Sequence, residues 1–425
     1  MKGKPLGRRL RVGTAFLLLL SFLFLLFATG LAIAPQGNQT AVFFKKTGDY
    51  MADFVQVARY SAGFDPYRSP VGYAQEKAYL PISYLIMGGV SALLGGVSAE
   101  AEPAAADGAV LWAAVLFMAL CAALLFVQLY ALKKGTRPVR LATTVLLFLS
   151  GIFLFSFERG NLILLAAAAT AFFLANYRAQ NRAVRELAFL ALAFAAALKG
   201  YPALLGLLLL YERRYRDALA TALYGVVLAF LPFLFLKGGF ANVIPWLADV
   251  RLNGIAYDHG VFQRFGPRFL LNALENKGAI SPSLRDGIVQ GLSVLTALLA
   301  LLGVWTDRFQ TTVWKRIGLL VCILVLLPSN SALYTGLYFL PVVVLFLDAE
   351  PRAPRDFLYL ALFVCLLCPF QFFVGRTDLT PLLVNFSAEG LFLALSFECA
   401  AAWISRIKAG GAPPALEASR AGPVS

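Results

Sequence analysis

"TAFLLLLSFLFLLFATGLAIA", residues 14–34, is an unbroken apolar run near the start of the chain. At about 1.5 Å per residue, a helix of this length crosses the hydrocarbon core of a bilayer, which is about 30 Å thick. The run follows a cluster of basic residues, Lys2, Lys4, Arg8, Arg9 and Arg11. Short segments rich in Lys and Arg stay in the cytoplasm. We therefore predict an uncleaved first membrane helix, with residues 1–11 in the cytoplasm.

The composition extends this prediction to the whole chain. Of 425 residues, 60% are hydrophobic and 14% are charged, and the mean hydropathy is +0.75. Such values exclude a soluble protein of this length. We predict an all-α polytopic membrane protein, with about 10 to 12 transmembrane helices forming a single domain in residues 1–408. Residues 409–425 lack apolar periodicity, and we expect a disordered cytoplasmic tail.

The net charge of +14 is concentrated in short clusters between apolar runs, so no nucleic-acid partner is needed to explain it. The clusters are residues 133–140, 178–185, 212–216, 306–316 and 351–355. We expect all of them in the cytoplasm, with both termini. Two long segments, 35–78 and 237–285, then lie on the extracytoplasmic side.

Two apolar segments are poor candidates for simple crossings. Residues 187–211 lie between two basic clusters, and Pro202 disfavours helical geometry at Tyr201. We predict a broken or re-entrant hairpin here, with Lys199 at its tip. Residues 79–97 are rich in glycine and favour an outward-facing hairpin over a full crossing.

The five cysteines all lie inside apolar segments, and "CLLC" at 365–368 has no His or carboxylate nearby in the sequence. They are typical of small buried apolar residues rather than ligands. We expect neither a metal nor a cofactor.

"GDYMADFVQVARYSAGFDPY", residues 48–67, predicts an amphipathic helix lying in the membrane interface, within the first outer segment. Asp65 precedes Pro66 and is typical of a turn. Asp53 is expected on the polar face. Asp49 precedes the helix and is compatible with either a helix cap or a functional carboxylate.

Several ionisable residues gather on the predicted outer side. Such groups at helix ends are costly to desolvate and are functional candidates. Because basic residues are unusual in outer segments, their excess in 237–285 suggests an anionic ligand such as a phosphate. A solvated segment that pairs its own charges is the alternative. The candidates are Glu158, Arg159, Lys199, Asp258, His259, Arg264 and Arg268.

Four stretches of the chain resemble a known family. They are the "GD" and "GFDPY" that bound 48–67, "YLPISYLIM" (79–87), "ERGNLILL" (158–165) and "AAALKGYPALLGLLLLYERRYRDAL" (195–219). Together they resemble the polyprenyl-phosphate-sugar-dependent glycosyltransferases of the GT-C superclass, most closely glycosyltransferase family 87. The resemblance implies a GT-C-like bundle in the cell (inner) membrane that moves a sugar, with mannose the family expectation, to a glycan or glycolipid acceptor.

The resemblance also implies roles for particular residues. A carboxylate of the first outer segment acts as general base, which aligns with Asp49, and with Asp53 as runner-up. Donor phosphate binding falls to Lys199, Arg159, Arg264 and Arg268. Substrate contacts are expected from Glu158, Asn161, Tyr201, Asp258, His259 and Tyr334. Family members often carry a His in the segment that here contains Tyr334, and this departure leaves the donor sugar open.

Two other functions remain open at this point. A transporter or lipid flippase would have buried charge within its spans and internal repeats. An O-antigen polymerase or ligase would place its chemistry in residues 237–285 rather than at Asp49.

Overall fold

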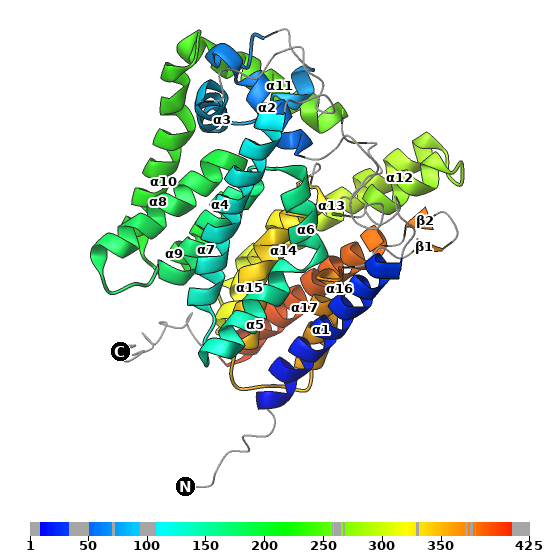
Figure 1. Cartoon of the computed structure of the whole chain (residues 1–425). Helices are drawn as coiled ribbons and strands as arrows, with labels where there is room; N and C mark the ends of the chain where they lie inside the picture. Colours follow the sequence, from blue (N-terminus) through cyan, green and yellow to red (C-terminus); the bar gives the residue numbers. More distant parts are fainter. Residues whose placement is uncertain are drawn as a thin grey trace.

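Long apolar helices form much of the structure, a computed structural model of the chain (Figure 1). It describes residues 9–33, 51–69, 73–93, 108–256, 258, 265–266, 268–328, 331–369, 373–374, 377–378 and 380–409. Five helices within these ranges are long and apolar enough to cross a membrane. They are α1 (Arg9–Ile33), α4 (Gly108–Leu132), α10 (Tyr215–Phe230, extended by a 3₁₀ turn to Phe235), α13 (Pro282–Asp307) and α17 (Thr380–Lys408).

The remaining elements are shorter. Within the bundle they are α3 (Pro81–Leu93), α5 (Arg137–Phe148), α6 (Gly151–Arg159), α7 (Ile163–Asn176), α8 (Arg182–Lys199), α9 (Leu207–Tyr211), α14 (Val313–Leu326), α15 (Phe339–Leu347) and α16 (Asp356–Leu366). At one end of the bundle lie α2 (Ala52–Tyr60), α11 (Val243–Ala256) and α12 (Arg268–Asn276). Two short strands, β1 (Phe373–Val374) and β2 (Thr377–Asp378), pair antiparallel.

The chain is thus a helical membrane protein with several spans. The helices α5 and α6 are bent by 58° at their junction and together would make a sixth candidate span. A helix such as α7 has 14 residues, or about 21 Å, and is shorter than the bilayer core. The predicted total of ten to twelve crossings therefore stays a prediction.

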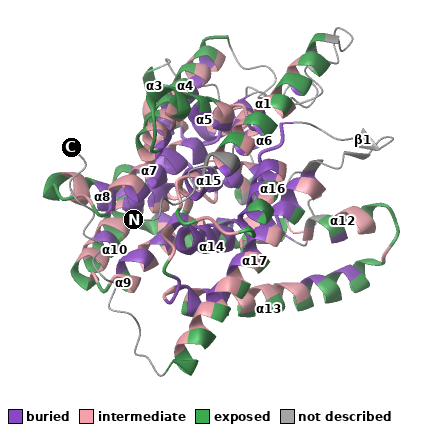
Figure 2. Cartoon of the chain, turned by 90° about the horizontal axis from the view of Figure 1, so that it is seen from below, coloured by how far each residue is buried: buried purple, intermediate pink, exposed green. Residues whose placement is uncertain are grey.

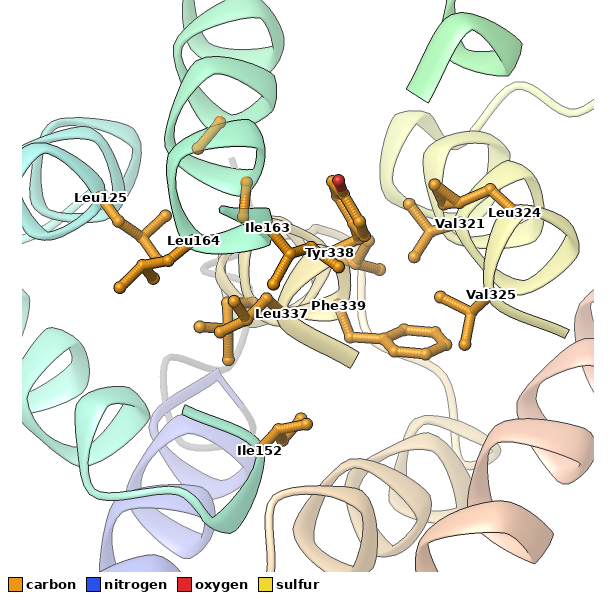
Figure 3. Close-up of a cluster of buried hydrophobic side chains, with 14 of the residues drawn as sticks. Leu125, Ile152, Ile163, Leu164, Val321, Leu324, Val325, Leu337, Tyr338 and Phe339 are labelled. Atoms are coloured by element: carbon orange, nitrogen blue, oxygen red, sulfur yellow. The ribbon is translucent and has the colours of Figure 1, made fainter. Parts of the chain in front are cut away.

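The core lies where the short helices meet. All residues of α14 from Trp314 to Leu326 are buried, as expected for a helix that is apolar on every side. Figure 3 shows Val321 and Val325 of α14 beside Phe339 of α15, with Ile163 of α7 close by. Exposed residues instead follow the outer faces of helices such as α10 and α13 (Figure 2). Lipid would cover these faces.

The five basic clusters lie at one end of the bundle. Contacts link them directly, as in Arg178–Glu212, or through a residue outside the clusters: Lys133–Asp348, Arg355–Glu398, Lys315–Glu398 and Arg316–Tyr211. Their predicted location on a common side is consistent with these contacts. That this side is the cytoplasm stays a prediction from the positive-inside rule.

The predicted break in 187–211 is confirmed. Asn181 caps the start of α8, where its side chain accepts from Ala183 N at 2.9 Å. The helix ends at Lys199 because Gly200 has φ +70° and Pro202 follows. The chain then returns through a 3₁₀ turn and α9, and Glu212 meets Arg178 at the basic end. Lys199 thus lies at the far end of a hairpin.

The predicted amphipathic helix is present as α2, but its expected position in the membrane interface is wrong. Six of its nine residues are buried, because α2 packs against α3, α4 and α6. The helix is therefore part of the protein interior rather than a surface element.

Candidate active site

Helix α2 is fixed to the end of α6 by a close backbone contact. Met51 N donates to Glu158 O at 2.7 Å. Gly160 ends α6 with φ +67°, and a Cβ there would lie 2.9 Å from Phe54 Cβ and 3.0 Å from Met51 Cα. Only glycine fits both the backbone conformation and this approach. The motif "ERGN" is therefore needed for docking α2.

Asp53 binds two residues of the same motif. Arg159 forms an ion pair with Asp53 Oδ1, and Asn161 Nδ2 donates to Asp53 Oδ2 at 2.6 Å. Asn161 is itself buried, and its Oδ1 accepts from Ile163 N at 2.9 Å at the start of α7. Asp53 is thus held at the junction of α2, α6 and α7 rather than on a solvated face.

Lys199 lies next to this junction, among aromatic rings. Its Nζ is 4.3 Å from the centre of the Tyr79 ring and 5.8 Å from that of Tyr334. The Tyr79 hydroxyl is in turn 3.5 Å from Asn161 Nδ2. Tyrosine rings stabilise an ammonium group by cation–π attraction. The chain of contacts therefore runs from Asp53 through Asn161 and Tyr79 to Lys199.

A cavity of about 450 Å³ opens at Lys199. Its lining combines aromatic rings, a few polar groups and a single carboxylate. The lining residues are Glu76, Ala78, Tyr79, Leu80, Leu198, Lys199, Gly200, Tyr201, Trp246, Val250, Asn253, Gly254, Pro328 and Tyr334. A concave site with a few polar groups on an apolar lining is typical of small-molecule binding.

An apolar groove of about 690 Å³ begins at the same place. It lies between α8, the 3₁₀ turn with α9, and α10, and its lining extends from Gly200 to Tyr215 near the basic end. Small residues such as Ala197, Ala203 and Gly225 keep it open. Gly200 lines both the groove and the cavity, so an apolar chain in the groove would have its end next to Lys199.

A second charged cluster lies in the segment 237–285 and α13. The Arg285 side chain is 1% exposed; its Nη1 lies 2.8 Å from Asp258 Oδ2 and 2.7 Å from Asp286 Oδ1. Arg268 Nη1 donates to Asp258 Oδ1 at 2.7 Å and its Nη2 to Ser293 Oγ at 3.1 Å. Arg268 and Asp258 are thus bound to each other, as in the self-paired alternative. Arg268 lines a smaller cavity of about 100 Å³, and Pro328 lines both cavities.

The structure brings together part of the predicted set. Tyr201, Tyr334 and Lys199 line one cavity. Glu158, Arg159 and Asn161 surround the docked end of α2. Three predicted residues, Asp49, His259 and Arg264, lie outside the described residues. Helix α2 begins at Ala52 with Met51 in the cap position, and both alternatives for Asp49, a helix cap or a functional carboxylate, stay predictions.

The sequence analysis missed four polar or aromatic residues of the cavity: Glu76, Tyr79, Trp246 and Asn253. Trp246, Val250, Asn253 and Gly254 share one face of α11, and this spacing was readable in the sequence. Among the described residues no group of three or more His, Cys, Asp or Glu side chains could hold a metal ion.

The fold and the cavity define a helical membrane protein with a cavity of mixed polar and apolar lining at the end of its bundle opposite the basic clusters. The family model "Glycosyltransferase family 87" matches residues 101–329, which is more than half of the chain. The chain belongs to glycosyltransferase family 87, and the resemblance seen in its motifs is confirmed. Comparison with curated proteins and with solved structures gave no match.

Membership of this family makes the protein a glycosyltransferase that acts with a sugar donor and an acceptor. The matched stretch contains Arg159, Asn161, Lys199 and α11. Asp53, Glu76, Tyr79 and Tyr334 lie outside it.

Proposed function

We propose that the protein transfers mannose from a polyprenyl-phosphate donor to a glycan or glycolipid acceptor, with inversion at the anomeric carbon. The observation that carries this proposal is the meeting of the Lys199 cavity and the apolar groove at Gly200. A donor made of a sugar phosphate and a long isoprenoid chain needs a polar and an apolar site side by side.

Lys199 is the group best placed for the donor phosphate. An ammonium group beside apolar and aromatic side chains attracts an anion more strongly than one in bulk solvent. It would also stabilise the charge that develops on the leaving phosphate, without the help of a metal or another cofactor. In this proposal Arg159, Arg264 and Arg268 also contribute positive charge to phosphate binding. Because Arg159 and Arg268 are held by Asp53 and Asp258, phosphate binding would use their remaining donors or displace these carboxylates.

The groove between α8 and α10 suits the isoprenoid chain. Its lining is almost entirely apolar, and it follows two helices along the bundle. A chain lying there would bury apolar surface against Ala and Gly positions that permit close approach.

Asp49 is the general base of the proposed reaction. Its carboxylate accepts the proton of the acceptor hydroxyl while the acceptor oxygen forms a bond to the anomeric carbon. The bond between this carbon and the phosphate oxygen breaks, and the electron pair leaves with polyprenyl phosphate. Attack and departure on opposite faces of the sugar give inversion.

The reaction takes place on the extracytoplasmic face of the membrane in this proposal. The cavity and the basic clusters lie at opposite ends of α8, because Lys199 ends this helix and Arg182 begins it. Since the positive-inside rule assigns the basic end to the cytoplasm, the cavity faces outward.

Purified protein in detergent or liposomes, mixed with polyprenyl-phosphate mannose and an acceptor glycan, tests the proposal. Release of polyprenyl phosphate and formation of a mannosylated acceptor are expected, whereas a nucleotide-linked mannose should give no product. Movement of the lipid across a liposome without release would indicate a flippase instead. Transfer only from a lipid pyrophosphate would indicate a polymerase or ligase.

A further inference from the structure

One wall of the cavity is a face of α11 together with the 3₁₀ turn Ala74–Glu76, which packs on that helix. Trp246 Nε1 donates to Ala78 O at 3.3 Å and fastens the end of this turn to α11. Trp246, Asn253 and Glu76 line the cavity from this wall.

A hydrogen bond from Tyr60 of α2 fixes the Glu76 side chain. The hydroxyl of Tyr60 donates to Glu76 Oε2, and Tyr60 is buried at the end of α2. Burial raises the pKa of the Tyr60 hydroxyl and the nearby Glu76 raises it further, so that Tyr60 stays a hydrogen-bond donor. The helix that carries Asp53 therefore also positions the Glu76 carboxylate before any substrate binds.

The charges in the cavity orient a sugar phosphate. A carboxylate repels a phosphate, whereas an ammonium group attracts it. Glu76 and Lys199 line the same cavity, so the phosphate is favoured near Lys199 and the neutral part of the donor near Glu76. Gly200, next to Lys199, is also where the apolar groove begins.

The α11 wall carries the chemistry that binds a neutral sugar. A carboxylate accepts hydrogen bonds from hydroxyl groups, and an amide both donates and accepts them. The flat face of an indole packs against the C–H groups of a pyranose ring. A site built to bond a substrate hydroxyl discriminates strongly against a substrate that cannot make the bond.

We propose that Glu76, Trp246 and Asn253 form the subsite that recognises the donor sugar, with Glu76 accepting hydrogen bonds from its hydroxyl groups. The inference rests on the proposed use of a lipid-linked sugar donor and adds to it the residues that select the sugar. Glu76 acts in this inference as a specificity residue, and the general base remains Asp49.

Glu76→Gln tests the inference, because it removes the charge and keeps the shape. The assay measures kcat/KM of transfer from polyprenyl-phosphate mannose, glucose and galactose, and separately the affinity for polyprenyl phosphate alone. We expect transfer of the preferred hexose to fall roughly 10- to 100-fold, the loss typical of a hydrogen bond to a charged group. The preference among the three hexoses should shrink, while the affinity for polyprenyl phosphate stays unchanged or rises.

Two further variants separate recognition from folding. Glu186→Gln is the matched control, since Glu186 accepts from Tyr224 at 3.3 Å at the opposite end of α8 from Lys199; it should behave as wild type. Asn253→Ala should shift the preference among hexoses in the same way, and it provides the test should Glu76→Gln fail to fold.

An unchanged ratio of kcat/KM among the hexoses in Glu76→Gln and Asn253→Ala would overturn the inference. So would a loss of polyprenyl phosphate affinity equal to the loss of transfer, because Glu76 would then serve the phosphate end. If wild-type protein transfers none of the three hexoses, the proposed function itself fails, which is a separate result.

Discussion

Asp53 and Arg159 form an ion pair that joins helix α2 to the last residue of α6. Asn161 adds a second bond to the same carboxylate, at 2.6 Å. All three side chains lie beside the contact in which Gly160 lets α2 approach α6. Asp53 therefore serves first to hold α2 against α6 and α7. This structural role differs from the role of general base proposed for Asp49.

Asp53→Asn is expected to destabilise the protein by about 1–3 kcal/mol, since it leaves a partly buried Arg159 without its carboxylate. Turnover should fall but remain measurable. Chemical unfolding in detergent micelles measures the loss of stability, and the transfer assay measures turnover. In a double-mutant cycle with Arg159→Gln, the two changes should not be additive. Complete loss of turnover at unchanged stability would instead make Asp53 the base.

Gly160→Ala should prevent the close docking of α2. The added methyl group would lie 2.9 to 3.0 Å from atoms of Phe54 and Met51, closer than van der Waals contact, in a backbone conformation that alanine rarely adopts. We expect a lower midpoint of thermal unfolding and a loss of transfer, because α2 carries Asp53 and Tyr60. Gly291→Ala, on α13, is a suitable control, since nothing outside its own stretch of helix lies within 4 Å of the position of its Cβ. Wild-type stability of Gly160→Ala would show that this approach is not required.

Lys199→Met removes the cationic group proposed to hold the donor phosphate. We expect kcat/KM to fall about 10²- to 10³-fold, as when one stabilising donor is removed from a charged transition state. Lys199→Arg should retain part of the activity. Lys277→Met, a change of the same kind at the exposed end of α12, should leave transfer intact. Full activity of Lys199→Met would exclude a part for this residue in phosphate binding.

The orientation of the bundle can be measured by cysteine labelling in intact cells. Ala74 and Thr136 are both exposed and lie at the cavity end and the basic end respectively. An impermeant thiol reagent should label Ala74→Cys in intact cells and Thr136→Cys only after permeabilisation. The native cysteines are buried or partly buried. Wild-type protein treated with the same reagent therefore gives the background labelling. The reverse pattern would invert the proposed topology.

The parts of the fold that depend on local sequence were predictable. Pro202 after Gly200 indicated that the helix would end at Lys199, and the apolar spacing of 52–60 indicated α2. Both follow from backbone geometry and periodicity, which act over a few residues.

The partners of these elements could not be read in the same way. Asp53 meets Arg159, which is 106 residues away, and Trp246 meets Ala78, which is 168 residues away. No local pattern encodes such contacts. A tyrosine in an apolar stretch, such as Tyr79, is interpreted as a core residue until its neighbours in the structure are known. The pairing of Arg268 with Asp258 likewise appears only in the structure.

The direct test of the central claim is the rate of polyprenyl phosphate release by Asp49→Asn, measured with polyprenyl-phosphate mannose and an acceptor glycan. The account predicts that this variant folds as wild type, with the same midpoint of thermal unfolding, and releases no polyprenyl phosphate above the rate without enzyme. Near-normal release by Asp49→Asn would contradict the account.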